Sequence, residues 1–371
     1  MTTTGTDSGR IRLGTRGSRL ALTQSGQVAE ALMAAGAPSE GSDAQRDGLD
    51  IDLVTVRTDG DGDRTPLRQL GGVGVFAARL RHALLDGEVD LVVHSFKDLP
   101  TQPVEGLEVI CVPPREDPHD ALCARDGLTL AALPERARVG TGSPRRAAQL
   151  LATRPDLEVV DLRGNVPTRL ARVRGLEAVG VGTDEPVAPS RADATGDLDA
   201  VVLALSGLRR LGLEHCASEV LDLETMLPAP AQGALAVEAR AGEDSAELAR
   251  AVAVLDDEPT RLAVTAERAL MARLGAGCAA PVGAWAHLSG GREPRVLALR
   301  AVVTSLDGGQ EVGCELSTEL PEVAGSPDTS GDTAAEAVRA AEALGGRAAE
   351  VLLEDGAAEI VDLHANKPRR D

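Results

Sequence analysis

Two short patterns occur twice in this chain, in the same order, and they constrain its fold more than any other feature. GTRGSRLA at 14–21 is echoed by GTGSPRRA at 140–147, and GEVDLVVHS at 87–95 is echoed by GDLDAVVLA at 196–204. Apolar β-branched runs alternate with helical patterns around both copies, which favours a mostly parallel sheet in each half. We therefore expect two similarly built α/β domains. Chance similarity between short glycine-rich turns is the alternative.

The spacing of apolar residues predicts the first elements by range. Strands are expected at 11–13, 51–56 and 90–93, and helices at 18–35 and 76–86. The pattern starts again at Arg138, just before the second copy of the first repeat. Residues 228–240 form a Pro-rich entry to another strand, which could return to the first sheet.

The remainder of the chain predicts a third unit and two loops. Residues 258–275 have a helical pattern, and the third unit follows them to the carboxyl terminus. The segments 177–196 and 319–332 are rich in Gly, Pro, Ser, Thr and Asp, so we expect surface loops or insertions there.

Composition and charge exclude several classes of partner. A formal net charge of -20 argues against nucleic acid, because the field of such a chain repels phosphate. With no Tyr, two Phe and one Trp, the chain also has almost no surface on which bases could stack. No apolar run approaches the roughly 18 residues of a membrane span, and the first ten residues lack the features of a secretory signal. We therefore expect a cytoplasmic protein that binds neither nucleic acid nor membranes.

The cysteines predict no metal site, but one of them has an unusual setting. Five cysteines, at positions 111, 123, 216, 278 and 314, are odd in number and lack CxxC spacing, so neither a disulfide framework nor a zinc site is indicated. Cys278 ends the helical pattern ERALMARLGAGCAAPVG at 267–283, beside glycine. Glycines there would let a bulky group approach the sulfur closely. An inert buried cysteine is the alternative.

Arginines gather at expected helix starts, where cations are disfavoured. In GTGSPRR, Ser143 suits the N-cap and Pro144 the first helical position, which places Arg145 and Arg146 in the first turn. The helix dipole opposes positive charge at that end, and a bound anion would reverse the effect because free N–H groups and guanidinium groups would converge on it. An anion site is therefore predicted.

A second site of the same design is expected after the first strand. GTRGSR places Arg16, Ser18 and Arg19 around another helix start, and both sites repeat one pattern. Further arginines follow later apparent strands, at Arg163, Arg169, Arg209 and Arg210. Together these residues predict a pocket for several carboxylates or phosphates. The alternative is that each arginine points into solvent.

The segment HSFKDLP, residues 94–100, is the strongest candidate for chemistry. Ser95, Lys97 and Asp98 come just past the carboxyl end of an expected strand, where open α/β sheets bind ligands. The repeat places Ser206 and Gly207 opposite Lys97 and Asp98, so the charged pair occurs in one copy only. A carboxylate there could hydrogen-bond a substrate amine or stabilise a cationic intermediate. An ordinary salt bridge is the alternative for Asp98, and His94 is expected to be a core histidine.

The chain resembles the porphobilinogen deaminase (hydroxymethylbilane synthase) family of tetrapyrrole and haem biosynthesis. The resemblance runs from Ile11 to about Val361 and rests on LGTRGSRLAL, GVGVF, ALLDGEVDLVVHSFKDLPT, PREDPHDAL, GTGSPRRAAQL, LRGNVPTRL, SGLRRLGLE, LPAPAQGALAVE and TAERALMARLGAGCAAPVG. It implies a transferase that condenses four porphobilinogens into hydroxymethylbilane, with loss of ammonia.

The resemblance also implies the fold and the domain limits. It implies two α/β domains like those of type II periplasmic binding proteins and a smaller carboxyl-terminal α/β domain. The expected ranges are 1–113 with 228–246, then 118–222, then 252–371. A monomer is implied.

Residue roles follow from the same resemblance. Cys278 would hold a dipyrromethane cofactor through a thioether, and Asp98 would be the catalytic carboxylate. The substrate and cofactor carboxylates would be bound by Arg16, Ser18, Ser95, Lys97, Thr141, Ser143, Arg145, Arg146, Arg163, Arg169, Arg210 and Gln232. Phe76 and Asp61 would flank the cleft, with Asp63 as the alternative acid.

Two other classes of function are weighed against this one. A ligand-binding protein of the periplasmic type would share the fold without the chemistry, because fold does not fix function. The cysteine motif counts against it. A nucleic-acid binder that uses the arginines is disfavoured by the net charge.

Overall fold

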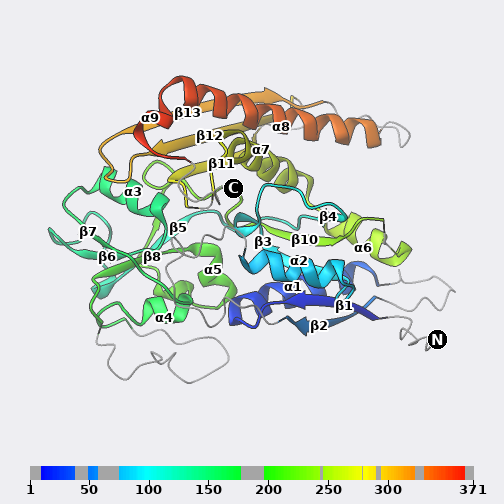
Figure 1. Ribbon diagram of the computed structural model, residues 1–371. Coiled ribbons are helices and arrows are strands. Elements are labelled where there is room, and N and C mark those ends of the chain that lie inside the picture. The colour runs from blue at the N-terminus through cyan, green and yellow to red at the C-terminus, as the bar shows by residue number, and fades with distance from the viewer. Residues whose placement is uncertain are drawn as a thin grey trace, which may run out of the picture. The chain divides into compact units, whose positions relative to one another are not determined.

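The computed structural model describes residues 10–37, 49–56, 75–176, 196–242, 245–277, 279–289, 294–321 and 330–363 (Figure 1). The chain divides into two compact units. Unit 1 holds the described residues of Met1–Pro66, Gly74–Pro114 and Leu235–Glu258, and unit 2 those of Arg115–Ala234 and Pro259–Asp371. No helix in these described ranges is long and apolar enough to cross a membrane.

Unit 1 is built on a five-stranded sheet in the order β2-β1-β3-β10-β4. Its strands are β1 (Arg10–Thr15), β2 (Asp50–Thr55), β3 (Leu91–Ser95), β4 (Leu107–Cys111) and β10 (Leu235–Arg240). β1 pairs in parallel with β2 and β3, whereas β10 runs antiparallel between β3 and β4. The predicted return of the chain to the first sheet after residue 228 is therefore confirmed.

Helices cover both faces of this sheet. α1 (Arg19–Ala35) and α6 (Ala246–Leu255) pack on one face, and α2 (Val75–Leu85) packs on the other. Successive side chains of a strand point to opposite faces of the sheet. Leu91 and Val93 of β3 therefore enter the core beneath α1, while Val92 between them packs with α2. Because both faces are buried, β3 consists of apolar residues until His94.

Unit 2 contains a second sheet with the same topology, in the order β7-β6-β8-β5-β9. Its strands are β5 (Asp120–Ala124), β6 (Arg138–Gly140), β7 (Glu158–Val160), β8 (Ala200–Ala204) and β9 (Glu219–Leu221). β6 pairs in parallel with β7 and β8, and β5 is the antiparallel strand. Each copy of a repeated pattern lies on the matching strand, so the prediction of two similarly built α/β sheets is confirmed.

Short helices follow the strands of this second sheet. They are α3 (Pro144–Thr153), α4 (Val166–Leu170) and α5 (Leu205–Arg210), with 3₁₀ helices η3 (Arg125–Gly127) and η4 (Glu214–Cys216). Ser143 is the N-cap of α3 and its hydroxyl accepts a hydrogen bond from the Arg146 N–H at 3.4 Å. The predicted start of this helix is confirmed.

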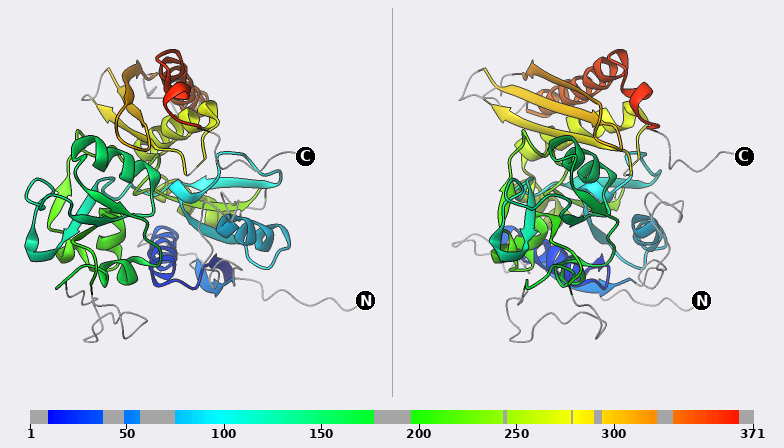
Figure 2. Two further views of the ribbon diagram at one scale, coloured as in Figure 1. Left: turned by 60° about the vertical axis from the view of Figure 1, so that its left-hand side comes forward. Right: turned by 90° about the vertical axis from the view of Figure 1, so that its left-hand side faces the viewer.

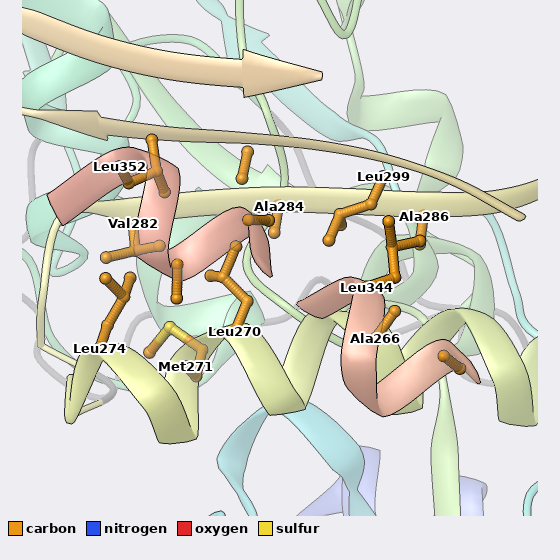
Figure 3. Close-up of a cluster of buried hydrophobic side chains, with 14 of the residues drawn as sticks. Ala266, Leu270, Met271, Leu274, Val282, Ala284, Ala286, Leu299, Leu344 and Leu352 are labelled. Atoms are coloured by element: carbon orange, nitrogen blue, oxygen red, sulfur yellow. The ribbon is translucent and has the colours of Figure 1, made fainter. Parts of the chain in front are cut away.

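The carboxyl-terminal part of unit 2 is a smaller α/β layer. Strands β11 (Val282–Ser289), β12 (Val296–Thr304) and β13 (Glu311–Glu319) form an antiparallel sheet. Helices α7 (Glu258–Leu274) and α8 (Ser330–Glu354) pack on one face of it, and α9 (Ala357–Ile360) follows α8 (Figure 2). Figure 3 shows Leu270 of α7 and Leu344 of α8 in the shared core. The helix predicted at 258–275 is confirmed.

The architecture is thus the predicted α/β one, with two five-stranded sheets of one topology and a smaller third layer. The three domain ranges stay a prediction, because the chain divides into only two compact units. The second and third sheets both belong to unit 2. The insertion predicted at 177–196 lies almost wholly outside the described residues.

Candidate active site

Five of the predicted site residues lie at one edge of the sheet in unit 1. Arg16 and Ser18 follow the carboxyl end of β1, and Ser95, Lys97 and Asp98 lie at or after the carboxyl end of β3. The two strands are parallel neighbours, with Leu13 paired to Leu91, so their carboxyl ends meet at the same edge. Ligands of open α/β sheets bind at this edge.

Asp98 is held at this edge by a short 3₁₀ helix, η2 (Phe96–Asp98). Phe96, the first residue of η2, and Leu99, which follows the helix, are 6% and 2% exposed and anchor the turn in the core. Asp98 itself is exposed, and no hydrogen bond or ion pair of its carboxylate occurs within the described ranges. The alternative of an ordinary salt bridge therefore has no support there. The carboxylate is available to a ligand.

Neighbouring contacts order the rest of this edge. Ser18 is the N-cap of α1, and its hydroxyl accepts a hydrogen bond from the Ala21 N–H at 3.3 Å. Gln24, from the second turn of α1, donates to the Ser95 hydroxyl at 3.1 Å. The start of α1 and the end of β3 are thereby tied together.

His94 is a buried structural residue, as predicted. Its Nε2 lies 3.1 Å from Glu238 of β10, which also accepts three hydrogen bonds from Arg81 of α2. Burial acts to raise the pKa of Glu238, but His94 and Arg81 outweigh it and the pKa lies below its usual value. The carboxylate therefore remains ionised inside unit 1.

In unit 2, the corresponding edge carries a second set of predicted residues. Thr141 and Ser143 follow β6, Arg163 and Arg169 follow β7, and Arg210 lies in the helix after β8. Strands β6, β7 and β8 are parallel, so these residues share the edge at their carboxyl ends. The structure thus divides the predicted residues into two edge groups, one in each unit.

The two arginines of α3 are buried and point at a carboxylate that the sequence reasoning missed. Arg145 and Arg146 are 3% and 6% exposed, so the solvent-facing alternative is wrong for both. Asp120, the first residue of β5 and fully buried, accepts from Arg145 Nη2 at 2.7 Å and from Arg146 Nε and Nη2 at 3.1 and 2.7 Å. An anion at the helix start is therefore present, and it is supplied by the chain.

Gln232 joins the same cluster. Its Nε2 donates to Asp120 Oδ1 at 2.8 Å, and its side-chain oxygen accepts from Arg146 Nη2 at 3.4 Å. Burial acts to raise the pKa of Asp120, but the two guanidinium groups outweigh it and hold that pKa well below its usual range. A signal was present in the sequence: DALCA places a lone acid at the start of an apolar run.

Two of the three further predicted arginines, Arg169 and Arg210, donate to backbone carbonyls that orient them. Arg169 Nε donates to the Gly164 carbonyl at 2.7 Å, and Arg163 is partly buried. Arg210 donates to the Gly233 carbonyl at 2.7 Å, and burial lowers its pKa against the opposing charge of Glu116. Gly233 has φ +90°, and a Cβ there would lie 2.2 Å from the Glu116 carbonyl, so this close approach requires glycine.

Three predictions lie outside the described residues. They are Cys278, Asp61 with its alternative Asp63, and the side chain of Phe76 at the start of α2. In the described ranges, no group of three acidic, histidine or cysteine side chains could hold a metal ion. The donors at the edge of each sheet are guanidinium, ammonium, amide and hydroxyl groups, which suit carboxylates.

Comparison with known proteins identifies relatives over nearly the whole chain. The family model described as "Porphobilinogen deaminase, dipyromethane cofactor binding domain" matches residues 11–248, and "Porphobilinogen deaminase, C-terminal domain" matches 261–354. The chain is 51% identical to porphobilinogen deaminase of Cutibacterium acnes, over 97% of this chain and 99% of that protein. It is 50% identical to the Micrococcus luteus protein of the same name, over 94% and 93% of the two chains. The Thermobifida fusca relative is 48% identical, over 94% and 95%.

Proposed function

The chain belongs to the porphobilinogen deaminase family, and from that premise we propose which residues perform its reaction. The family consists of transferases that join four porphobilinogens head to tail into hydroxymethylbilane, with release of ammonia, on a dipyrromethane cofactor. The reaction belongs to tetrapyrrole and haem biosynthesis.

Asp98 is proposed as the catalytic carboxylate. The observation that carries this proposal is an exposed acid without an ion-pair partner in the described ranges, fixed at the ligand-binding edge by buried neighbours. Loss of ammonia from porphobilinogen leaves an electron-deficient, azafulvene-like group whose pyrrole nitrogen carries positive character. A fixed carboxylate stabilises that charge and can accept the proton that leaves carbon after the new bond forms.

The edge arginines and hydroxyls are proposed to hold the carboxylates of substrate and cofactor. Each porphobilinogen carries two carboxylates, so the growing chain is a polyanion. Hydrogen bonds between charged partners contribute roughly 1.5–3 kcal/mol each. The proposed donors are Arg16, Ser18, Ser95 and Lys97 in unit 1, and Thr141, Ser143, Arg145, Arg146, Arg163, Arg169, Arg210 and Gln232 in unit 2. Asp61 and Phe76 are proposed to flank the bound chain.

Cys278 is proposed as the attachment residue of the dipyrromethane. The residues that the structure describes fit such a group: the donors at the unit-2 edge are cationic or hydroxyl groups, and Arg145 Nε is buried without a hydrogen-bond partner there. When bound, the cofactor supplies the terminal pyrrole to which the first substrate unit is joined. In this proposal the residues of this chain hold its carboxylates, and the Asp98 carboxylate acts on the reacting pyrrole.

The oligomeric state, the cellular compartment and the domain limits are also proposals. We propose a cytoplasmic monomer whose domains follow the three ranges predicted above. The four described cysteines are free thiols, and thiols persist in a reducing compartment. Sedimentation at micromolar concentration should give the mass of one chain, and a dimer would contradict the proposal.

Substitution of Asp98 by Asn tests the catalytic assignment. We expect Asp98→Asn to lose at least a hundredfold in porphobilinogen consumption, because the amide has the shape of the carboxylate without its charge or basicity. Asp126→Asn is a matched control, since Asp126 is also an exposed acid in a 3₁₀ helix that follows a strand. The control should keep full activity. Wild-type turnover by Asp98→Asn would refute the role.

Intact mass tests the attachment residue separately. Purified wild type should be heavier than its sequence by a dipyrrole, and peptide mapping should place the added mass on Cys278. A fully active chain of unmodified mass would contradict this assignment while leaving that of Asp98 open to its own test.

A further inference from the structure

We propose that Asp120 is a positioning residue for substrate binding: it orients Arg145 and Arg146 and offsets one of their charges, so that this pair of arginines accepts one external carboxylate. The inference rests on the proposed role of those arginines in binding carboxylates. Asp120 itself is enclosed by protein and is not expected to touch the substrate.

The first support is geometric. Asp120 accepts four hydrogen bonds from three side chains: one from Arg145, two from Arg146 and one from Gln232, at distances from 2.7 to 3.1 Å. All three donors were predicted as ligands of substrate or cofactor, yet they converge on an acid of the chain. Arg146 donates through both Nε and Nη2 to Asp120 Oδ1, and Arg145 donates to Oδ2, so the fixed carboxylate restricts the direction of both guanidinium groups.

The outer contacts of both arginines complete the orientation. Arg145 Nη1 donates to the Leu227 carbonyl at 2.5 Å, and Arg146 Nη1 donates to the Val202 carbonyl at 3.2 Å. Leu227 is held in turn by the Gln149 side chain, which donates to its carbonyl and accepts from its N–H. Each guanidinium is thus fixed at two ends before any ligand binds. Such preorganisation lowers the entropy that is lost on binding.

Charge provides the second support. Two buried guanidinium groups without a counter-ion would repel each other and lose their hydration, which is costly in an interior. One carboxylate leaves a net charge of about one positive unit, enough to attract one ligand carboxylate. Asp120 lies at the edge where β8 ends, because β5 is antiparallel to β8 and pairs Asp120 with Ala204. From there its carboxylate reaches both arginines.

Chemical rescue tests this role directly. Asp120→Ala leaves a space that formate can occupy between the two arginines. Without formate, we expect the KM for porphobilinogen to rise at least tenfold and a smaller fraction of chains to carry the dipyrrole by intact mass. With formate present during purification and assay, KM should return to within about threefold of the wild-type value. Formamide, which has the same shape without the charge, should not rescue.

Two further variants separate positioning from general stability. Asp120→Asn keeps the side-chain shape, removes the charge and leaves no space for formate, so its raised KM should not respond to formate. Asp199→Ala is the matched control, because Asp199 is a buried acid that Arg125 contacts at 2.9 Å at the opposite edge of the same sheet. Its loss should lower thermal stability without changing KM, with or without formate.

The outcomes also separate this inference from the function on which it rests. Arg146→Gln with a wild-type KM would show that the arginines do not hold carboxylates, and the proposed function of this edge would fail. An impaired Arg146→Gln together with wild-type KM in Asp120→Ala would overturn the inference alone. If Asp120→Ala does not fold, Asp120→Asn decides the matter. An unchanged KM in Asp120→Asn overturns the inference, and a raised KM that does not change when formate is added supports it.

Discussion

At the scale of single residues, the chain repeatedly buries a carboxylate among arginines. Asp120, Glu238 and Glu267 are at most 2% exposed, and each accepts from arginine. The sequence predicted that the arginines of GTGSPRR need an anion, because helix dipoles and N-caps act locally. It did not identify Asp120, because a pairing across 25 positions depends on which strands become neighbours.

Loss of a buried pair should cost far more than loss of an exposed one. Glu267 accepts from Arg115 at 2.7 and 3.1 Å and from the N–H groups of Ala231 and Ala286. Glu267→Gln leaves a buried guanidinium uncompensated, so we expect about 3–5 kcal/mol less free energy of unfolding in urea. Glu350→Gln, which removes the exposed pair with Arg273, should lose at most about 1 kcal/mol. Equal losses would contradict the ranking.

The buried carboxylates also predict how stability changes with pH. A carboxyl group whose pKa is lowered on folding stabilises the fold above its unfolded pKa, near 4.3 for Glu, and that contribution is lost as pH falls through its folded pKa. The pKa of Glu238 is lowered. The difference in unfolding free energy between wild type and Glu238→Gln should therefore be constant near neutral pH and shrink progressively below about pH 4. A difference that grows as pH falls would contradict this sign.

At the scale of elements, local signals predicted more than long-range ones. The helix starts at Ser18 and Ser143 followed from N-cap chemistry, and the helix at 258–275 followed from its period. Strand β5 was not predicted, since it is antiparallel and separated from its partner β8 by most of the second repeat. Its single acid, Asp120, joins β5 to the two arginines of α3.

Matched N-caps distinguish structure from function at this scale. Ser143 caps α3, and Ser245 caps α6 with a hydrogen bond from the Leu248 N–H at 3.1 Å. Substitution of either by Ala should reduce the free energy of unfolding by about 1 kcal/mol, because one N–H loses its acceptor. Only Ser143→Ala should also raise the KM for porphobilinogen. If both variants keep the wild-type KM, Ser143 serves α3 alone.

At the scale of the whole molecule, the repeated patterns predicted two sheets of one topology, and the strand orders confirm this. The catalytic assignment depends on a difference between the copies. After β3 the chain turns through a 3₁₀ helix that carries Lys97 and Asp98, whereas after β8 it enters α5 with Ser206 and Gly207 at the equivalent positions. Of two equivalent positions in sheets of the same topology, only one therefore carries a carboxylate, Asp98. The shared topology does not require an acid there.

Intact mass spectrometry during turnover tests the role of Asp98 most directly. Wild type and Asp98→Asn are mixed with a few equivalents of porphobilinogen, and only molecules whose starting mass shows the dipyrrole are compared. Wild type should gain mass in steps of one porphobilinogen less ammonia, and Asp98→Asn should remain at its starting mass. The same series of steps, at the same rate, in Asp98→Asn would contradict the account.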